Sequence, residues 1–180
     1  RDLPNNKAAG LDHIPAELLK CGGDAMVTEL TAIANIVWNS CKIPDDWRIG
    51  AITILPKKGT LSDSNNWRVI TLLCSARKLI CRLLLKRIQN SIDVRLRDEQ
   101  AGFRRGRSCN EQIFSLRIII EQSLEWQYPI AINYVDFKKA FDSVYRPALW
   151  QILKLYGVPQ KFIDIFKEMY ENSRCCVKTS

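Results

Sequence analysis

The sequence has few of the residues that build metal–thiolate or histidine-based sites. It holds one histidine, His13, and its seven cysteines include no C-x-x-C pair. Structural zinc sites need Cys and His ligands at short spacing, so we predict no zinc site. A single histidine also leaves little room for histidine-based catalysis. The odd number of scattered cysteines instead indicates buried, reduced thiols in an intracellular protein.

Long apolar runs and repeats are also lacking. No stretch approaches the roughly 20 apolar residues needed to cross a bilayer, and residues 1–7 do not resemble a signal peptide. We therefore expect an intracellular protein of the nucleus or cytoplasm, without a membrane partner. The 180 residues suffice for one domain with a core or for two small lobes. A start without Met and a strand-like end at 177–180 lead us to expect a piece of a longer protein.

Positive charge is concentrated in one contiguous third of the chain. Residues 42–107 hold 15 Lys and Arg against 6 Asp and Glu, whereas the other residues hold 12 against 13. A localised positive field suits a polyanion, and nucleic acid is the natural candidate in the absence of a membrane segment. An ordinary solvated basic surface is the alternative that charge alone leaves open.

Apolar periodicity and turn residues predict an α/β chain with much helix. Helices are expected over residues 15–22, 24–41, 75–96, 108–124, 147–156 and 160–172. Strands are expected over residues 51–55, 67–70 and 130–136. The polar residues 57–66 between the first two strands predict a β-hairpin. The helix after Ser108 is expected to turn Ile113, Leu116, Ile120 and Leu124 inward.

Two basic segments could bind phosphate. Lys57 and Lys58 precede the hairpin loop and Arg68 follows it, so these cations could close on a triphosphate, although Lys-rich turns are usually only solvated. Residues 101–107 form a loop rich in Gly and Arg, in which glycine lets the backbone approach a phosphate chain closely.

One carboxylate follows the third predicted strand. Ile132 and Val135 read as part of a buried strand that delivers Asp136 at its end, with Phe141 five residues later. A carboxylate fixed by a strand end is well placed to hold a divalent metal, and metal-assisted phosphoryl transfer needs such ligands. The alternative is that Asp136 only caps the following helix. The ring of Phe141 could press against a sugar and exclude a 2′-hydroxyl group.

Four blocks, in this order, resemble the reverse transcriptase of non-LTR (LINE-type) retrotransposons. The blocks are residues 7–17 (KAAGLDHIPAE), residues 47–73 with ILPKKG and NWRVITLL, residues 100–108 (QAGFRRGRS) and residues 135–142 (VDFKKAFD). The resemblance implies a partial right-hand polymerase fold, with fingers over 1–128 and the start of the palm over 129–180. It also implies an RNA-directed DNA polymerase that uses Mg²⁺, an RNA template, a DNA primer and deoxynucleoside triphosphates.

The resemblance also implies roles for individual residues. Asp136 is expected to be the catalytic, metal-binding aspartate, with the backbone carbonyl of Phe137 as a second metal ligand. Phe141 is expected to be the steric gate that favours deoxynucleotides. Arg68, with Lys57 or Lys58, is expected to grip the incoming triphosphate, and further nucleotide-binding positions are expected at Phe137, Ala140 and Phe141. Positions along the template or primer backbone are expected at Gly102, Phe103, Arg104, Arg105 and Arg107.

The sequence departs from the family pattern in two respects. Val69 stands where the family usually has Pro. The family carries its remaining palm aspartates in an Asp-Asp pair, and no such pair follows Asp136 in this sequence. The later candidate for a second metal ligand is Asp164, which lies in a helical pattern. One carboxylate cannot hold two metals, so we expect this segment alone to be inert as a polymerase. Asp142 is expected to hold the turn after Phe141. The alternative function is a non-catalytic nucleic-acid-binding domain derived from a decayed or repurposed retroelement.

Overall fold

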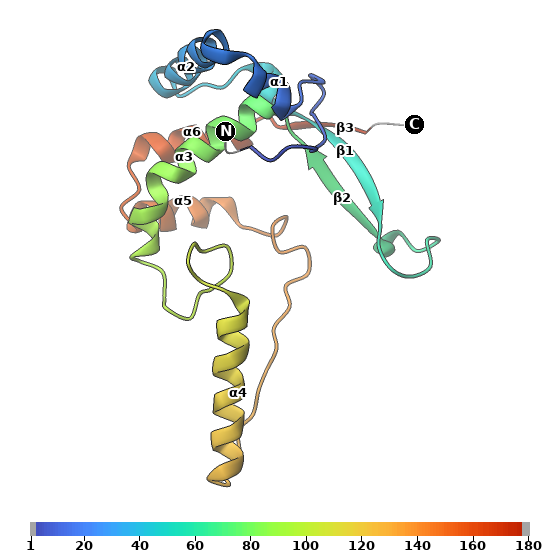
Figure 1. Cartoon of the computed structure of the whole chain (residues 1–180), viewed down its shortest axis with the longest axis vertical. Helices are drawn as coiled ribbons and strands as arrows, with labels where there is room; N and C mark the ends of the chain where they lie inside the picture. The colour runs from blue at the N-terminus through green and yellow to red at the C-terminus, as the bar shows by residue number, and fades with distance from the viewer. Residues whose placement is uncertain (1–2, 178–180) are drawn as a thin grey trace. The chain divides into compact units, whose positions relative to one another are not determined.

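The computed structural model describes residues 3–177 (Figure 1). The chain forms two compact units, one from Arg1–Ile88 with Pro159–Ser180 and the other from Gln89–Val158. Helices and a small sheet together confirm the α/β class. The predicted division into fingers and palm at residue 128 is a functional one, which these units do not test and which stays a prediction. No helix of the described part is long and apolar enough to span a bilayer.

Helices of unit 1 form its core. They are α1 (Ala16–Cys21), α2 (Gly23–Ser40), α3 (Ser75–Asp93, which enters unit 2 after Ile88) and α6 (Gln160–Tyr170). On α3, Ile80, Leu84 and Ile88 recur every fourth residue and are buried, as the apolar periodicity predicts. On α6 the buried residues include Ile163 and Ile165.

A three-stranded sheet completes unit 1. Its strands are β1 (Ile49–Pro56), β2 (Trp67–Leu72) and β3 (Arg174–Val177), in the order β2-β1-β3. The antiparallel pairing of β1 with β2 confirms the predicted hairpin, which Figure 1 shows as the longest part of the sheet. β3 runs parallel to β1. Of the expected C-terminal strand, Val177 ends β3 and residues 178–180 lie outside the described residues.

The N-terminal block packs against the start of α3. A Cβ atom on Gly10 would lie 2.7 Å from the backbone nitrogen of Cys74, so only glycine allows this approach. The buried Ser75 hydroxyl donates to the Ile14 carbonyl at 2.7 Å. These contacts place the first block beside the β2–α3 junction.

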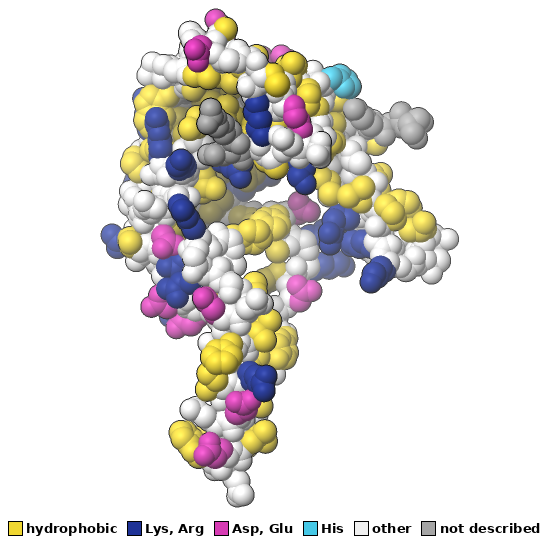
Figure 2. Space-filling model, viewed as in Figure 1, with side chains coloured by type: hydrophobic (Ala, Val, Ile, Leu, Met, Phe, Trp, Pro, Cys, Tyr) yellow, Lys and Arg dark blue, Asp and Glu magenta, His cyan; other side chains and the backbone are white. Residues whose placement is uncertain are grey.

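Unit 2 contains α4 (Cys109–Glu125) and α5 (Arg146–Leu155). Ser108 caps α4 as predicted, because its hydroxyl accepts from Glu111 N–H and the Glu111 carboxylate accepts from Ser108 N–H. The predicted inner face of α4 is wrong, because Ile113 and Leu124 are 66% and 73% exposed. Figure 2 shows apolar side chains uncovered along this helix.

All seven cysteines are free thiols. Cys74 is buried, and burial raises the pKa of the Cys74 and Cys81 thiols, which favours their protonated form. The expectation of buried thiols is wrong for the four exposed cysteines, which are Cys21, Cys109, Cys175 and Cys176.

Candidate nucleotide and nucleic-acid interface

The hairpin of unit 1 aligns two of the predicted triphosphate ligands. Leu55 pairs with Arg68, and the Lys57 N–H extends the ladder by donating to the Asn66 carbonyl at 2.7 Å. Side chains alternate along a strand, so Lys57 lies on the same face as Leu55 and Arg68. Lys58 follows outside the ladder. The register therefore favours Lys57 over Lys58 as the partner of Arg68, a choice that the sequence left open.

The cations of the hairpin differ in their present contacts. Lys57 Nζ donates to the Asn65 carbonyl at 3.0 Å, which ties it to the loop. Lys58 and Arg68 are exposed, and neither side chain has an ion pair or hydrogen bond within residues 3–177. Figure 2 shows dark blue side chains over this end of the hairpin. Arg68 thus presents a free guanidinium fork to an incoming anion.

In unit 2, the side chain of Arg104 is held inside the Gly- and Arg-rich loop of residues 101–107, the arginine loop. The Arg104 side chain is only 7% exposed, and its Nε lies 2.5 Å from Asp93 Oδ1. Its Nη2 donates to the Asp93 carbonyl at 3.0 Å and its Nη1 to the Arg97 carbonyl at 2.8 Å. Hydrogen bonding to Arg104 holds the pKa of Asp93 below its ordinary range, and the same contact raises the pKa of Arg104. These bonds give Arg104 a structural role, and its predicted contact with nucleic acid stays a prediction.

The other arginines of the loop are more accessible. Arg105 is exposed and has no side-chain partner among residues 3–177. Arg107 pairs with Asp98 at 2.7 Å, where the side chains are 38% and 87% exposed. An ion pair this exposed contributes little and can be exchanged for a phosphate. Gly106, with φ of 74°, supplies the left-handed turn between the two arginines.

The segment before Asp136 is not the buried strand that the sequence predicts. Residues 128–137 form no helix or strand, and Val135 is 77% exposed. A strand requires a neighbouring strand, and within residues 3–177 no strand pairs with this segment. Ile130 and Ile132 are each 40% exposed. The predicted strand and its burial depend on a partner that local sequence does not supply.

Phe141 lies against the arginine loop. The rings of Phe141 and Phe103 meet edge to face, with centroids 6.0 Å apart and planes at 77°. Unit 2 contains two complete motif blocks, residues 100–108 and 135–142. The structure therefore brings one residue of each block into contact. Gly102 precedes Phe103 in the turn, and Ala140 precedes Phe141 in the turn 138–143. Sequence reasoning missed the pairing of the two rings.

The described residues supply a partial set of metal ligands. Asp136 is exposed and offers a carboxylate, and Phe137 follows it with a backbone carbonyl. Among residues 3–177 no group of three or more His, Cys, Asp or Glu residues is close enough to hold a metal ion. Asp142 contributes its backbone N–H to the turn, 2.9 Å from the Lys139 carbonyl. Asp164 accepts from Gln160 within α6 at 2.8 Å.

Sequence reasoning also missed two arginines that position the hairpin. Arg77 Nη1 donates to the Trp47 carbonyl at 2.5 Å, and its Nη2 to the Met169 carbonyl at 2.9 Å. Arg48 bonds the Glu168 carboxylate and donates to the Glu171 carbonyl at 2.8 Å. Both arginines tie the end of α6 to the residues before β1. Both arginines belong to the basic residues 42–107, but the charge of that region does not show which arginines pair within the fold.

Comparison with known proteins identifies the family. A family model described as reverse transcriptase (RNA-dependent DNA polymerase) matches residues 55–179. The chain is 30% identical over 182 residues to a probable RNA-directed DNA polymerase from transposon BS of Drosophila melanogaster, covering 99% of this chain and 20% of that protein. It is 28% identical over 166 residues to the RNA-directed DNA polymerase from mobile element jockey of the same species, covering 91% of this chain and 18% of that protein.

A third relative comes from a vertebrate. The chain is 26% identical over 178 residues to a 149 kDa protein of transposon TX1 of Xenopus laevis, covering 99% of this chain and 14% of that protein. The chain thus spans a fifth or less of the length of these relatives. The matches to the proteins of transposons BS and TX1 each cover 99% of the chain, and with it the four blocks. The chain therefore belongs to the reverse transcriptase family and is related to the polymerases of LINE-type transposons.

Proposed function

We propose that this chain is the part of a retroelement reverse transcriptase that grips the incoming deoxynucleoside triphosphate and the backbone of the RNA template or DNA primer. The observation that carries the proposal is the hairpin register, which sets Lys57 and Arg68 on one face. A lysine gives a point charge and an arginine a planar fork, and the two together suit a triphosphate. The family match, which includes both residues, supports this assignment.

The family implies a divalent metal, and we propose that it is Mg²⁺. Oxygen ligands suit this ion, and Asp136 with the Phe137 carbonyl supplies two of them. When bound, the metal would activate the attacking hydroxyl and neutralise charge on the triphosphate. The described residues hold too few ligands for two ions. The part of this chain in the reaction is therefore to contribute one carboxylate and to bind and orient substrate.

The remaining roles follow the same proposal. Phe141 would exclude the 2′-hydroxyl group of a ribonucleotide, and Arg105 and Arg107 would contact backbone phosphates. We propose that the protein works inside the cell, in the nucleus or the cytoplasm. A non-catalytic nucleic-acid-binding domain is the second candidate, favoured by the lack of partner carboxylates around Asp136 within residues 3–177.

Binding measured across a salt series tests the proposal. The chain should bind an RNA–DNA hybrid with little sequence preference, and the logarithm of its affinity should fall linearly with the logarithm of salt concentration. A flat response would contradict phosphate-driven binding. Primer extension by a longer chain that includes the remaining palm aspartates separates the two candidates, since only the polymerase extends the primer.

A further inference from the structure

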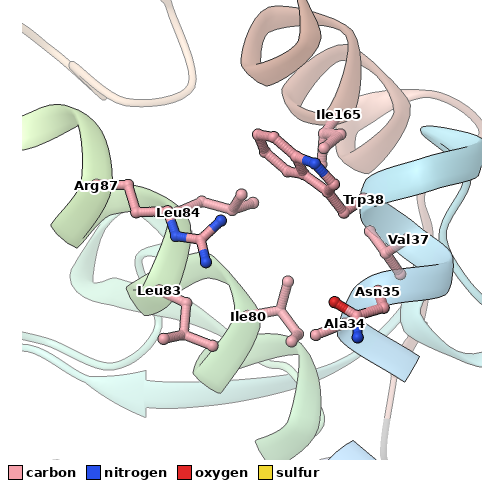
Figure 3. A pocket seen from close by; sticks show the side chains of 9 residues that line it. All are labelled: Ala34, Asn35, Val37, Trp38, Ile80, Leu83, Leu84, Arg87 and Ile165. Carbon is pink, nitrogen blue, oxygen red and sulfur yellow. The ribbon is translucent and has the colours of Figure 1, made fainter. Parts of the chain in front are cut away.

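A cavity of about 270 Å³ lies among α2, α3 and α6 in unit 1, away from the hairpin residues described above (Figure 3). Its lining is apolar except for the Asn35 amide and the Arg87 guanidinium group. Drug-sized ligands occupy pockets of about 300–1,000 Å³. This cavity is therefore of a size for one side chain or one nucleobase.

Two cations stand over the Trp38 ring in the cavity wall, and of these Arg87 lines the cavity whereas Lys161 does not. The guanidinium carbon of Arg87 lies 5.6 Å from the centroid of the Trp38 ring, and Lys161 Nζ lies 4.9 Å from it. Phe162 fixes the indole by an edge-to-face contact at 5.0 Å between ring centroids. None of the nine lining residues is acidic. The cavity thus favours a flat, apolar body that carries a negative charge beside it.

Asn35 adds a group that can recognise a base. Its amide offers donors and an acceptor, and these can pair with the edge of a nucleobase. Figure 3 shows Asn35, Trp38 and Arg87 around the same space. Unpaired RNA bases are bound by stacking on aromatic rings and arginine planes, with hydrogen bonds to their edges. The three side chains supply each of these elements.

We propose that this cavity binds a single unpaired nucleotide of RNA, an inference that rests on the proposed function. The base would take the place of the Arg87 guanidinium over the Trp38 ring, with its edge at Asn35, and Arg87, which is exposed, would turn to pair with the adjoining phosphate. An acidic peptide with one apolar anchor would match the same charges. RNA is favoured because Arg87 belongs to the basic residues 42–107 and because the amide suits a base edge.

Fluorescence anisotropy with two labelled single-stranded RNAs tests the site. One RNA carries all its bases, and the other is of equal length with abasic positions. Trp38→Ala should weaken binding of the complete RNA about five- to 150-fold, the range expected for losing one stacked base. It should leave binding of the abasic RNA nearly unchanged, and Trp38→Phe should retain most of the affinity.

Two further variants keep the test decisive. Trp126→Ala removes a tryptophan that is 71% exposed in unit 2 and should change neither affinity. Asn35 is exposed, so Asn35→Leu should fold normally and should weaken binding of the complete RNA alone. Circular dichroism and thermal melting check the fold of each variant. If Trp38→Ala does not fold, the result for Asn35→Leu decides.

The outcomes separate this inference from the proposed function. Equal losses for both RNAs, or no loss from Trp38→Ala and Asn35→Leu, overturn the nucleotide site even if the wild type binds RNA in a salt-dependent way. Displacement of a bound acidic peptide by these substitutions, without an effect on RNA, assigns the cavity to a protein and overturns it as well. Failure of the wild-type chain to bind either RNA, or a flat salt response, instead counts against the proposed function.

Discussion

The ring of Phe103 lies edge to face against the ring of Phe141, with 6.0 Å between their centroids. Phe103 holds a φ of 58°, in the left-handed region that costs a non-glycine residue of order 1–3 kcal/mol. Strain of this kind persists where surrounding structure maintains it, and it is frequent at functional sites. The contact supports Phe103 as the residue that backs the predicted sugar gate.

Substitution of either ring should change sugar discrimination in a longer chain that includes the remaining palm aspartates. Phe141→Val should raise the use of ribonucleotides relative to deoxynucleotides about tenfold or more, because the smaller side chain leaves room for the 2′-hydroxyl group. Phe103→Ala should raise it about two- to tenfold, since an aromatic pair contributes about 0.5–1.5 kcal/mol. The ratio of kcat/KM values for the two nucleotides measures both effects. An unchanged ratio in Phe141→Val would contradict the gate.

Substitutions of the neighbouring residues Arg104 and Arg105 should have different effects, one on stability and the other on RNA binding. Arg105→Ala should weaken RNA binding for all sequences and reduce the salt slope by about 1, the signature of one lost phosphate contact. Arg104→Ala should instead lower the thermal midpoint, because the carbonyls of Asp93 and Arg97 lose their donor. Salt-series titration and thermal melting separate the effects. Lys154→Ala is the matched control and should alter neither quantity.

The ion pair between Asp93 and Arg104 should make the loop sensitive to acid. The pKa of Asp93 is lower in the folded chain than its ordinary value, so the folded state binds the proton less readily. The stabilisation is fully present above the ordinary carboxyl pKa of about 4 and is lost as the pH falls toward the folded value. The protection of the amides in residues 93–107 against hydrogen exchange, measured relative to their intrinsic exchange rate at each pH, should fall over this range. Asp93→Asn should remove that loss of protection, and an unchanged pH profile of protection in this variant would contradict the assignment.

The face shared by Lys57 and Arg68 predicts coupled substitutions at the hairpin. Triphosphate affinity should fall in both Lys57→Ala and Arg68→Ala, and less in Lys58→Ala, which changes a residue outside the ladder. If Lys57 and Arg68 grip one ligand, their combined loss should differ from the sum of the single losses by about 0.5 kcal/mol or more. Titration with a fluorescent deoxynucleoside triphosphate measures each affinity. Purely additive losses would mean that the cations act separately.

Asp136→Asn tests the catalytic assignment without disturbing nucleic-acid binding. In a longer chain with the remaining palm aspartates, the substitution should abolish primer extension, because a neutral amide oxygen holds a divalent metal much more weakly than a charged carboxylate. Template affinity should remain nearly as in the wild type, because Asp136 is exposed and is not one of the cations that bind backbone phosphates. Asp142→Asn should retain extension if this residue acts only in the turn. Extension by the Asp136→Asn chain would remove Asp136 from the catalytic residues.

Several local elements and the family can be predicted from sequence patterns alone. The buried positions of α3 follow from its apolar periodicity, the start of α4 from the capping box at Ser108, and the hairpin from the polar loop between two apolar runs. Each of these features depends on residues within a few positions of one another, which is why a pattern reveals them. The four motif blocks, which also lie within the sequence itself, indicate the reverse transcriptase family.

Tertiary structure decided which side chains are free to bind. Arg104 and Arg105 are adjacent and alike in sequence, yet only Arg104 meets Asp93 and the carbonyls of the loop. The choice between Lys57 and Lys58 depended on the hairpin register, and the pairing of Phe103 with Phe141 on a contact 38 positions apart in the chain. Burial of residues 130–135 failed because it requires neighbours that no local pattern encodes. Contacts between residues distant in the chain set the exposure of side chains and the register of the hairpin. These two properties determine which side chains can contact a ligand.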